Sequence, residues 1–161
     1  MLRNREIILG GGCFWGVSEL FRRLKGITFC EAGYCQGSKD NVTYEEVCSN
    51  QYGFIEVCRI GYNEEVVSLE TILELFFMAI DPLAIDRQGN DIGHQYQSGI
   101  FVSNVDDYNF CLQFLAAKMP NNILLEYVHH YCRAEEYHQD YLVKNPNGYC
   151  HIDFSILNKL K

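Results

Sequence analysis

The chain has 161 residues, with 13 Lys and Arg against 21 Asp and Glu, which gives a formal net charge of -8 at pH 7. Its length predicts one domain, and its 48% hydrophobic and 21% charged content excludes a disordered or fibrous protein. The negative charge argues against nucleic acid as a partner, because phosphate binding needs clustered Lys and Arg. The eight cysteines, roughly 5% of the residues, fall below the ~8–10% of disulfide-built scaffolds.

The predicted elements mix strands and helices without strict alternation. Strands are expected at 6–9, 27–34, 54–62, 99–102 and 123–128. Helical segments are expected between Cys13 and Gly26 and at 43–48, 68–78, 106–118 and 134–142, the fourth directing Phe110, Phe114 and Leu115 inward. This order predicts an α+β fold, a single two-layer domain over residues 1–161 with a central mixed sheet packed against helices and an irregular C-terminal tail.

The N-terminus lacks the features of a secretory signal. Its first six residues carry charge and lead directly into a short apolar run at 7–9, whereas a signal needs an apolar region of ~7–15 residues. No stretch approaches the ~18 apolar residues of a membrane helix. We therefore expect a cytoplasmic protein without membrane association. In that compartment cysteines stay reduced unless they take part in catalysis or sensing, so a disulfide framework is not expected.

The segment Gly-Gly-Gly-Cys-Phe-Trp-Gly at residues 10–16 is the most informative of the chain. Its glycines permit a tight turn after the first strand, which predicts Cys13 in the first turn of a helix. A helix N-terminus stabilises a thiolate and can lower its pKa from ~8.5 to ~3.5–7.5. The segment lacks both the Gly-Lys-Ser/Thr of a P-loop and the third glycine of a dinucleotide site. On its own it leaves two possibilities, a reactive thiol or a buried cysteine that packs as a small hydrophobe.

A carboxylate interrupts an apolar strand face. Strand periodicity over 54–62 places Glu56 on the same side as Phe54 and Cys58, and that side is otherwise apolar. A carboxyl group in such surroundings has a raised pKa and can hold a proton at neutral pH, as a general acid must. The alternatives are a half-buried face or an ion pair between Glu56 and an arginine.

Other polar positions are ambiguous by residue type alone. The loop at 87–97 is polar and contains glycine, and it could be a binding loop or a solvated turn. The segment His129-His130-x-Cys132 could supply metal ligands, but the chain has no C-x₂-C pair of the kind that zinc sites usually show. We therefore expect neither a metal nor a cofactor. A cysteine-based redox-sensing or metal-binding module without enzymatic activity remains the alternative.

Ordered motifs in this sequence resemble those of the A-type peptide methionine sulfoxide reductases. The motifs are GCFWG at 12–16, TYEEVCS at 43–49, GxxEV at 53–57, ELFF at 74–77, DP at 81–82, NDIGxQY at 90–96, AExYHQDYL at 134–142 and KNPNGYC at 144–150. They keep the family's order and cover nearly the whole chain. The resemblance implies reduction of the S epimer of methionine sulfoxide, protein-bound or free, as a repair of oxidative damage.

The same resemblance implies roles for individual residues. Cys13 would attack the sulfoxide sulfur, and Glu56 would donate a proton to the departing oxygen. Tyr44 and Tyr96 would hydrogen-bond that oxygen, and Asp91 would help to order the region around it. Phe14 and Trp15 would form a pocket for the methyl group of the substrate. Cys150 would be the resolving thiol.

Cys150 would attack the Cys13 sulfenic acid and form a disulfide that thioredoxin reduces by exchange. Turn residues around Cys150 indicate weak local structure, so residues 144–161 are expected to form a flexible tail. Cys35, in a segment less rich in glycine than the family's version, is an open competitor for the resolving step. The remaining cysteines, Cys30, Cys48, Cys58, Cys111 and Cys132, are expected to be mostly buried thiols.

Two departures from the family pattern lie near the expected site. Phe54 stands where the family usually has His, which removes any polar support that this His gives to Glu56. His94 stands where Thr is usual, which brings a titratable ring close to Asp91 and Tyr96. The resemblance otherwise implies a monomer that acts on oxidised proteins or free methionine sulfoxide.

Overall fold

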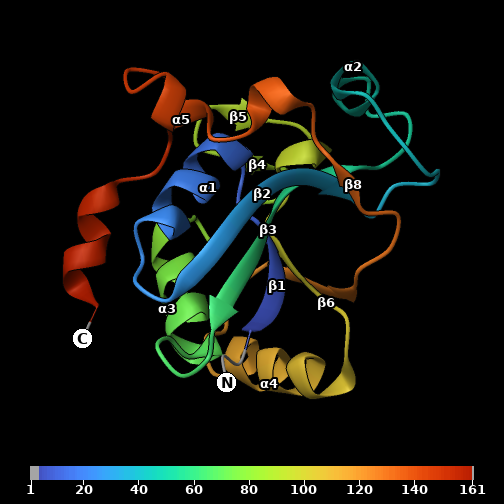
Figure 1. The fold of residues 1–161 in the computed structure, drawn as a ribbon. Helices are drawn as coiled ribbons and strands as arrows, with labels where there is room; N and C mark the ends of the chain where they lie inside the picture. The colour runs from blue at the N-terminus through green and yellow to red at the C-terminus, as the bar shows by residue number, and fades with distance from the viewer. Residues whose placement is uncertain (1–3, 161) are drawn as a thin grey trace.

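The computed structural model describes residues 4–160, so residues 1–3, on which part of the targeting expectation rests, and residue 161 lie outside it. Its main sheet has six strands in the order β7-β6-β1-β3-β2-β8 (Figure 1). Neighbouring strands are antiparallel except β6 and β7, which are parallel, so the sheet is mixed as predicted. Its strands are β1 (Asn4–Gly10), β2 (Ile27–Cys35), β3 (Ile55–Asn63), β6 (Gly99–Val102), β7 (Leu124–Tyr127) and β8 (Cys132–Arg133).

The helices begin where the sequence offers capping side chains. Ser68 accepts a hydrogen bond from the backbone N–H of Thr71, and Thr43 forms a reciprocal capping box with Glu46. The helices are α1 (Phe14–Arg22), α2 (Tyr44–Cys48), α3 (Leu69–Ala79), α4 (Val105–Ala116) and α5 (Tyr141–Lys144), with 3-10 turns η1 (His94–Tyr96), η2 (Glu136–His138) and η3 (Phe154–Lys159). Within the described part of the chain, none of these helices is long and apolar enough to cross a membrane.

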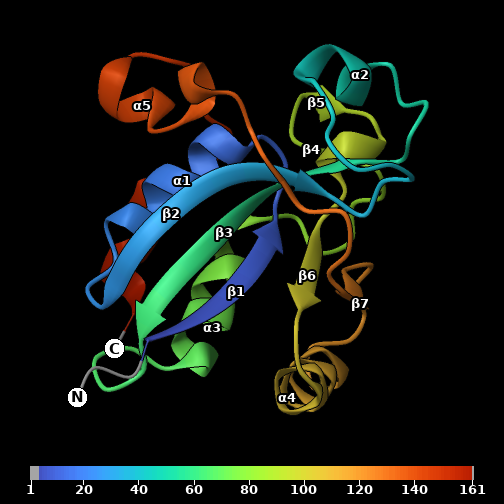
Figure 2. The same cartoon turned by 45° about the vertical axis from the view of Figure 1, so that its right-hand side comes forward.

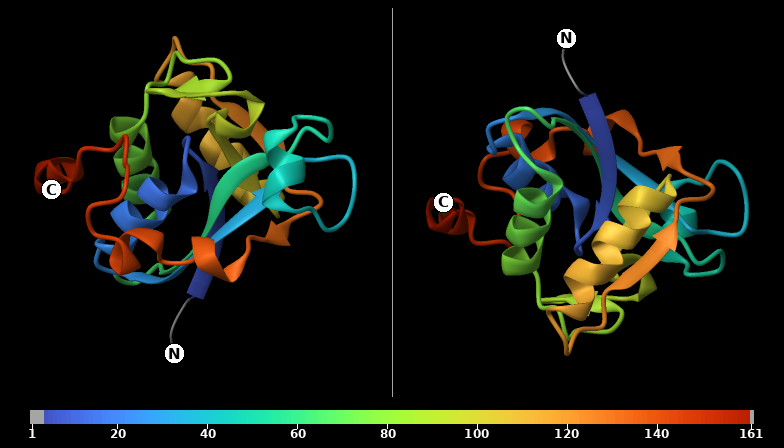
Figure 3. Two further views of the ribbon diagram at one scale, coloured as in Figure 1. Left: turned by 90° about the horizontal axis from the view of Figure 1, so that it is seen from above. Right: turned by 90° about the horizontal axis from the view of Figure 1, so that it is seen from below.

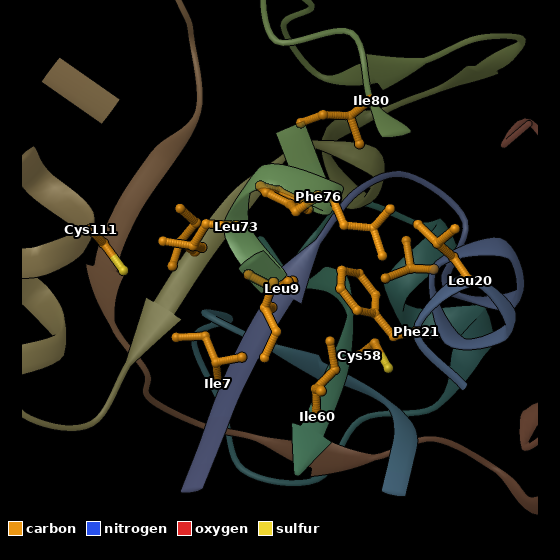
Figure 4. Close-up of a cluster of buried hydrophobic side chains, with 14 of the residues drawn as sticks. Ile7, Leu9, Leu20, Phe21, Cys58, Ile60, Leu73, Phe76, Ile80 and Cys111 are labelled. Carbon is orange, nitrogen blue, oxygen red and sulfur yellow. The ribbon is translucent and has the colours of Figure 1, made fainter. Parts of the chain in front are cut away.

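The main core lies between the sheet and the helices α1 and α3, which cover one face of the curved sheet (Figures 1 and 2). Leu9 from β1, Phe21 from α1 and Phe76 from α3 meet there without solvent exposure (Figure 4). Each fully buried side chain of this kind contributes ~1.5–3 kcal/mol. Cys58 and Cys111 also point into this core, which confirms their expected role as packing thiols.

The opposite face of the sheet carries a smaller apolar cluster. Ile8, Cys35, Ile55, Val57 and Phe101 form it. Strand alternation accounts for the division, because Glu56 and its same-face neighbours point to one side while Ile55 and Val57 point to the other. The alternation predicted over 54–62 is therefore confirmed. It also places Cys35 on the far side of the sheet from the main core.

Two expectations about the helices are wrong. Residues 134–142 do not form a continuous helix but the 3-10 turn η2 followed by α5, because Asp140 adopts a left-handed conformation with φ of 52°. The side chain of Gln139 instead bonds the backbone N–H and C=O of Ala32 on β2. On α4, Phe110 is 41% exposed and Cys111 takes the inward position one turn before Leu115, whereas Leu115 is buried and Phe114 packs against the main core as predicted.

The C-terminal segment packs onto the domain. Ile152 and Ile156 are buried in the main core, and η3 lies beside α3 (Figure 3). The segment before them is a turn, closed by a hydrogen bond from Gly148 N–H to Asn145 C=O. These contacts describe a docked position of the tail. Its predicted flexibility stays a prediction.

Candidate active site

Cys13 caps the N-terminus of α1, as the sequence predicts. β1 ends at Gly10, and the chain turns through Gly12 with φ of 85°, a conformation that favours glycine. A Cβ at Gly12 would lie 2.7 Å from the Cβ of Gln88, so a larger residue would also clash. The turn places Cys13 at the N-cap position with 8% exposure. Its sulfur therefore faces the interior of the site rather than bulk solvent.

Burial raises the pKa of the Cys13 thiol above its ordinary value, and the nearby carboxylate of Glu56 adds to this effect. The backbone N–H of Trp15 acts in the opposite direction but does not compensate. The lowered pKa expected from the helix N-terminus is therefore wrong for the substrate-free protein. In a site this enclosed, the free energy needed to remove a thiolate from water exceeds the stabilisation that one helix N-terminus provides.

Glu56 is the buried acid of the site. It is 1% exposed on β3, and burial raises its pKa to about 7, as the apolar strand face predicts. The backbone N–H of Phe14 donates to Oε1 at 3.3 Å, and the amide of Gln95 donates to Oε2 at 2.9 Å. These partners, and not an arginine, hold the carboxyl group. One of them is the N–H directly after Cys13, so the same turn fixes the thiol and the acid.

Tyr44 and Tyr96 reach the site from two separate segments. Tyr44 is the first residue of α2 and Tyr96 the last of η1, and both pack against the apolar cluster that contains Cys13 and Phe14. Burial raises the pKa of both phenols, and the charge of Glu56 contributes in each case. Both hydroxyl groups therefore remain protonated at neutral pH and can donate hydrogen bonds.

Asp91 lies at the start of β5 (Asp91–Ile92), which pairs with β4 (Arg87–Gln88). Burial raises the pKa of its carboxyl group, and its charge in turn raises the pKa of Glu56 and of Tyr96. Its Oδ2 atom is buried and has no hydrogen-bond partner among the residues from 4 to 160. The polar loop predicted at 87–97 therefore directs Asp91 Oδ2 and Gln95 inward, while its tip at Gly89 and Asn90 is exposed.

An aromatic cage adjoins the thiol. Trp15 stacks on Tyr141 at a centroid distance of 3.7 Å, and its Nε1–H donates to His138 Nδ1 at 3.0 Å. His138 is 3% exposed and lies between the rings of Phe14 and Tyr44, at centroid distances of 4.9 and 4.7 Å. The cage provides an apolar surface with one polar group within it. Phe14 is buried in the apolar cluster that contains Cys13, and Trp15 packs against this cluster.

Sequence reasoning missed three residues that build this site. Gln95 holds Glu56, and Glu135 braces α2 by accepting hydrogen bonds from Tyr44 N–H at 2.9 Å and Tyr34 hydroxyl at 2.7 Å. His138 accepts from Trp15 at Nδ1, so its proton is on Nε2, which is buried and without a partner in the described chain. All three residues belong to the family motifs at 90–96 and 134–142, and this membership was the only sequence signal for a role in the site. Their hydrogen-bond partners are set by tertiary contacts, which the motifs do not show.

Cys150 lies one helical turn beyond Cys13. A Cβ added at Gly16 would come 2.8 Å from the Cys150 sulfur, so this sulfur rests directly on the first turns of α1. Burial raises the pKa of the Cys150 thiol, and the backbone N–H of Ile152 donates to the sulfur at 3.3 Å. Cys35 is fully buried on the opposite face of the sheet. In this structure Cys35 and Cys13 lie in apolar clusters on opposite faces of the sheet, whereas the Cys150 sulfur lies on the helix that Cys13 caps.

Cys48 differs from the expected buried thiols. It is exposed at the end of α2, and the amide of Gln95 lies 3.6 Å from its sulfur. All eight cysteines are free in the structure.

The suggested metal ligands have other partners. His130 Nδ1 lies 2.7 Å from the carbonyl oxygen of Gly37, and the Cys132 thiol lies 3.9 Å from that of Val42. Across residues 4–160 the structure contains no group of three His, Cys, Asp or Glu side chains arranged to hold a metal ion.

Comparison with known proteins gives a consistent result. Residues 5–161 match the family model described as peptide methionine sulfoxide reductase. The chain belongs to the A-type peptide methionine sulfoxide reductase family. Relatives named peptide methionine sulfoxide reductase MsrA from Clostridium perfringens and Clostridium botulinum are 44% and 47% identical to it over 153 residues, with 92% of this chain and 98% of each relative covered.

A solved structure of the reduced form of Mxr1 from Saccharomyces cerevisiae is 33% identical, with a TM-score of 0.88. That match covers 92% of this chain and 90% of the yeast chain. The similarity confirms the predicted α+β fold and places this reductase among oxidoreductases.

The two departures from the family pattern have separate consequences in this reductase. Phe54 is buried and packs its ring against Gly37, so it supplies no polar contact to Glu56. Gln95 and the Phe14 N–H provide that support instead. His94 bonds a nearby residue, because its Nδ1 lies 2.9 Å from Asp86 Oδ1. The substituted ring therefore connects Asp86 to the 3-10 turn η1 that carries Tyr96.

Proposed function

We propose that this reductase converts methionine S-sulfoxide, in oxidised proteins or as the free amino acid, to methionine through a sulfenic acid on Cys13. The observation that supports this most strongly is the pairing of the buried Glu56 with the turn that carries Cys13. A carboxyl group with a pKa of about 7 accepts a hydrogen bond from the N–H next to the thiol. A nucleophile and an acid are thereby held together beside an apolar cluster.

In the first step the Cys13 sulfur attacks the substrate sulfur. Glu56 gives its proton to the sulfoxide oxygen and takes the proton of the thiol, so the site as a whole keeps its charge. This attack forms a bond between the two sulfur atoms. That bond and the sulfur–oxygen bond of the substrate then break as the protonated oxygen moves to the Cys13 sulfur, which leaves a sulfenic acid on Cys13. The substrate sulfur gains two electrons and leaves as a thioether, while the Cys13 sulfur loses two.

The surrounding residues bind and orient the sulfoxide. Tyr44 and Tyr96 keep their protons and can donate hydrogen bonds to the polarised oxygen, which stabilises the charge that develops on it. Phe14 and Trp15 would provide the apolar contact for the methyl group of the substrate, next to His138. The neutral His138 keeps the cage uncharged, because burial lowers the pKa of its ring.

In the second step the Cys150 sulfur attacks the Cys13 sulfenic acid. A disulfide forms and the hydroxyl group leaves as water with the proton of Cys150. A dithiol protein of the thioredoxin type then reduces the disulfide by exchange. The yeast relative Mxr1 has been solved in complex with Trx2, in a structure that matches this fold with a TM-score of 0.62 at 19% identity. That assembly motivates the choice of partner.

A single-turnover experiment tests the proposal. The reduced protein is mixed with one equivalent of N-acetylmethionine S-sulfoxide without reductant, and the product and the cysteine modifications are measured by mass spectrometry. We expect one equivalent of the thioether and a Cys13–Cys150 disulfide. Cys150→Ser should still form one equivalent and leave a trappable sulfenic acid on Cys13. Formation of the thioether by Cys13→Ser would contradict the proposal.

A further inference from the structure

His151, the residue after Cys150, is anchored to the loop that opens α1. Its Nε2 lies 2.7 Å from the carbonyl oxygen of Gly11. A carbonyl can only accept a hydrogen bond, so Nε2 carries the proton and donates. Burial lowers the pKa of the His151 ring, which therefore stays neutral at pH 7. The ring is enclosed, because a Cβ at Gly12 would lie 3.0 Å from its Nε2 and a Cβ at Gly89 would lie 3.5 Å from its Cβ.

The two consecutive tail residues bracket the reactive cysteine. Cys150 rests its sulfur on Gly16, three residues after Cys13, and His151 bonds Gly11, two residues before it. Residues three apart on a helix lie on the same face, with roughly 5–6 Å between their Cβ atoms. The tail therefore crosses the first turn of α1 with one contact on each side of Cys13. The contact at Gly11 is the polar and directional one.

The contacts of Cys150 itself are local. Turn residues precede it, its sulfur interacts with the N–H and C=O of Ile152, and the neighbouring Tyr149 bonds the backbone of Asn90 in the loop at 87–97. Without an anchor such a segment has many conformations, and a thiol in it meets its target rarely. Fixing one orientation converts the encounter into a well-oriented intramolecular reaction, which can raise rates by several orders of magnitude.

We propose that His151 is a positioning residue for the resolving step, in which its hydrogen bond to Gly11 holds the Cys150 thiol over Gly16 within reach of the Cys13 sulfenic acid. We call this hydrogen bond the His151 latch. The inference rests on the proposed function and goes beyond it, because it assigns the resolving rate to a residue that takes no part in sulfoxide reduction. His151 neither touches the substrate nor exchanges a proton.

The test separates the two steps of a single turnover. His151→Phe keeps an aromatic ring but removes the donor, His151→Gln keeps an N–H donor, and His129→Ala removes an exposed histidine as a control. Each reduced variant is mixed with one equivalent of N-acetylmethionine S-sulfoxide and quenched over time. Thioether is quantified, the sulfenic acid is trapped with dimedone, and the disulfide is measured by intact mass.

We expect His151→Phe to form thioether at the wild-type rate but to form the Cys13–Cys150 disulfide about tenfold more slowly, with sulfenic acid accumulating. His151→Gln should recover most of the disulfide rate, and His129→Ala should match the wild type in both steps. The thioether yield of each variant reports its correctly folded fraction, so a folding defect is distinguished from slow resolution.

Three results would overturn the latch. A wild-type disulfide rate in His151→Phe would show that Gly11 is not needed as an anchor. Equal slowing in His151→Phe and His151→Gln would assign the effect to ring packing rather than to the hydrogen bond. Failure of the wild-type protein to form thioether would overturn the proposed function and the latch with it, and this outcome is visible before the disulfide is measured.

Discussion

Glu56 lies on the central strand β3 and Cys13 follows the central strand β1, whereas Asp91, Gln95 and Tyr96 come from the loop at 87–97. β1 and β3, which carry the first two residues into place, each pair with strands on both sides. The loop contains only two two-residue strands and one 3-10 turn. The residues whose bonds change in the reaction are thus held by the backbone with the most strand pairing. The residues that influence the pKa of Glu56 and the hydrogen bonds to the sulfoxide oxygen lie on a segment held by side-chain contacts.

The difference indicates how sensitive each part of the site is to substitution. A displaced group on the sheet side alters the reacting atoms themselves. A displaced group on the loop side alters the pKa of Glu56 or the hydrogen bonds to the oxygen, effects of a few kcal/mol at most. Substitutions on the two sides should therefore differ in the size of the effect and in the quantity that changes.

The largest effect is expected for Glu56→Gln on the sheet side. The amide keeps the shape of the side chain but cannot supply an acidic proton. The rate of thioether formation in a single turnover should fall about 10²- to 10⁴-fold, the usual contribution of a positioned acid. Rapid-quench measurement at pH 6 checks this, because the wild-type acid is then protonated. A loss of less than about threefold would remove Glu56 from the proton transfer.

Stability measurements on the same variant show whether it is folded. The pKa of Glu56 is raised from 4.5 to about 7, so the native protein binds its proton more tightly than the unfolded chain does. The stabilisation is complete below pH 4.5 and is lost as the pH rises through 7. Each pKa unit corresponds to about 1.4 kcal/mol, so the wild type should lose ~3 kcal/mol of unfolding free energy between pH 4 and pH 8 that Glu56→Gln retains. Urea titrations at both pH values measure this.

A smaller effect is expected for Gln95→Met on the loop side. Methionine has a similar length but no N–H donor, and the hydrogen bond from Gln95 holds the pKa of Glu56 down. Its loss should move the midpoint of the pH profile of thioether formation upward by about one pH unit, given the ~1.5–3 kcal/mol of a hydrogen bond to a charged group. Gln113→Met, on the exposed surface of α4, serves as the control. A downward shift would contradict the assigned hydrogen bond.

Local rules predicted the sheet side well. The alternation over 54–62 placed Glu56 on the apolar strand face, because a strand allows only two side-chain directions, and the structure decided for burial and a raised pKa over a half-buried face or an arginine partner. The same local reasoning was wrong for the pKa of Cys13. It considered the helix N-terminus but not the enclosure of the thiol by other segments, which only the tertiary structure shows.

The loop side and the C-terminal third were harder to predict for a related reason. Glu135 and Gln139 bond the backbone of α2 and β2 across long sequence separations, and Asp140, directly after Gln139, is left-handed. Their apolar and polar spacing resembles a helix, but these tertiary hydrogen bonds prevent a continuous one. Gln95 likewise gains its role only when the loop folds against β3.

The central claim is that Glu56 must be protonated when Cys13 attacks, and the pH dependence of thioether formation tests it most directly. Wild-type protein is mixed with a subsaturating amount of N-acetylmethionine S-sulfoxide between pH 5.5 and 8.5, and the first-turnover rate is measured. With a pKa of about 7, the rate should be constant at low pH and fall about tenfold per unit above pH 7. A rate that rises through pH 7 would contradict the account, because it would require the ionised carboxylate to take the proton of Cys13.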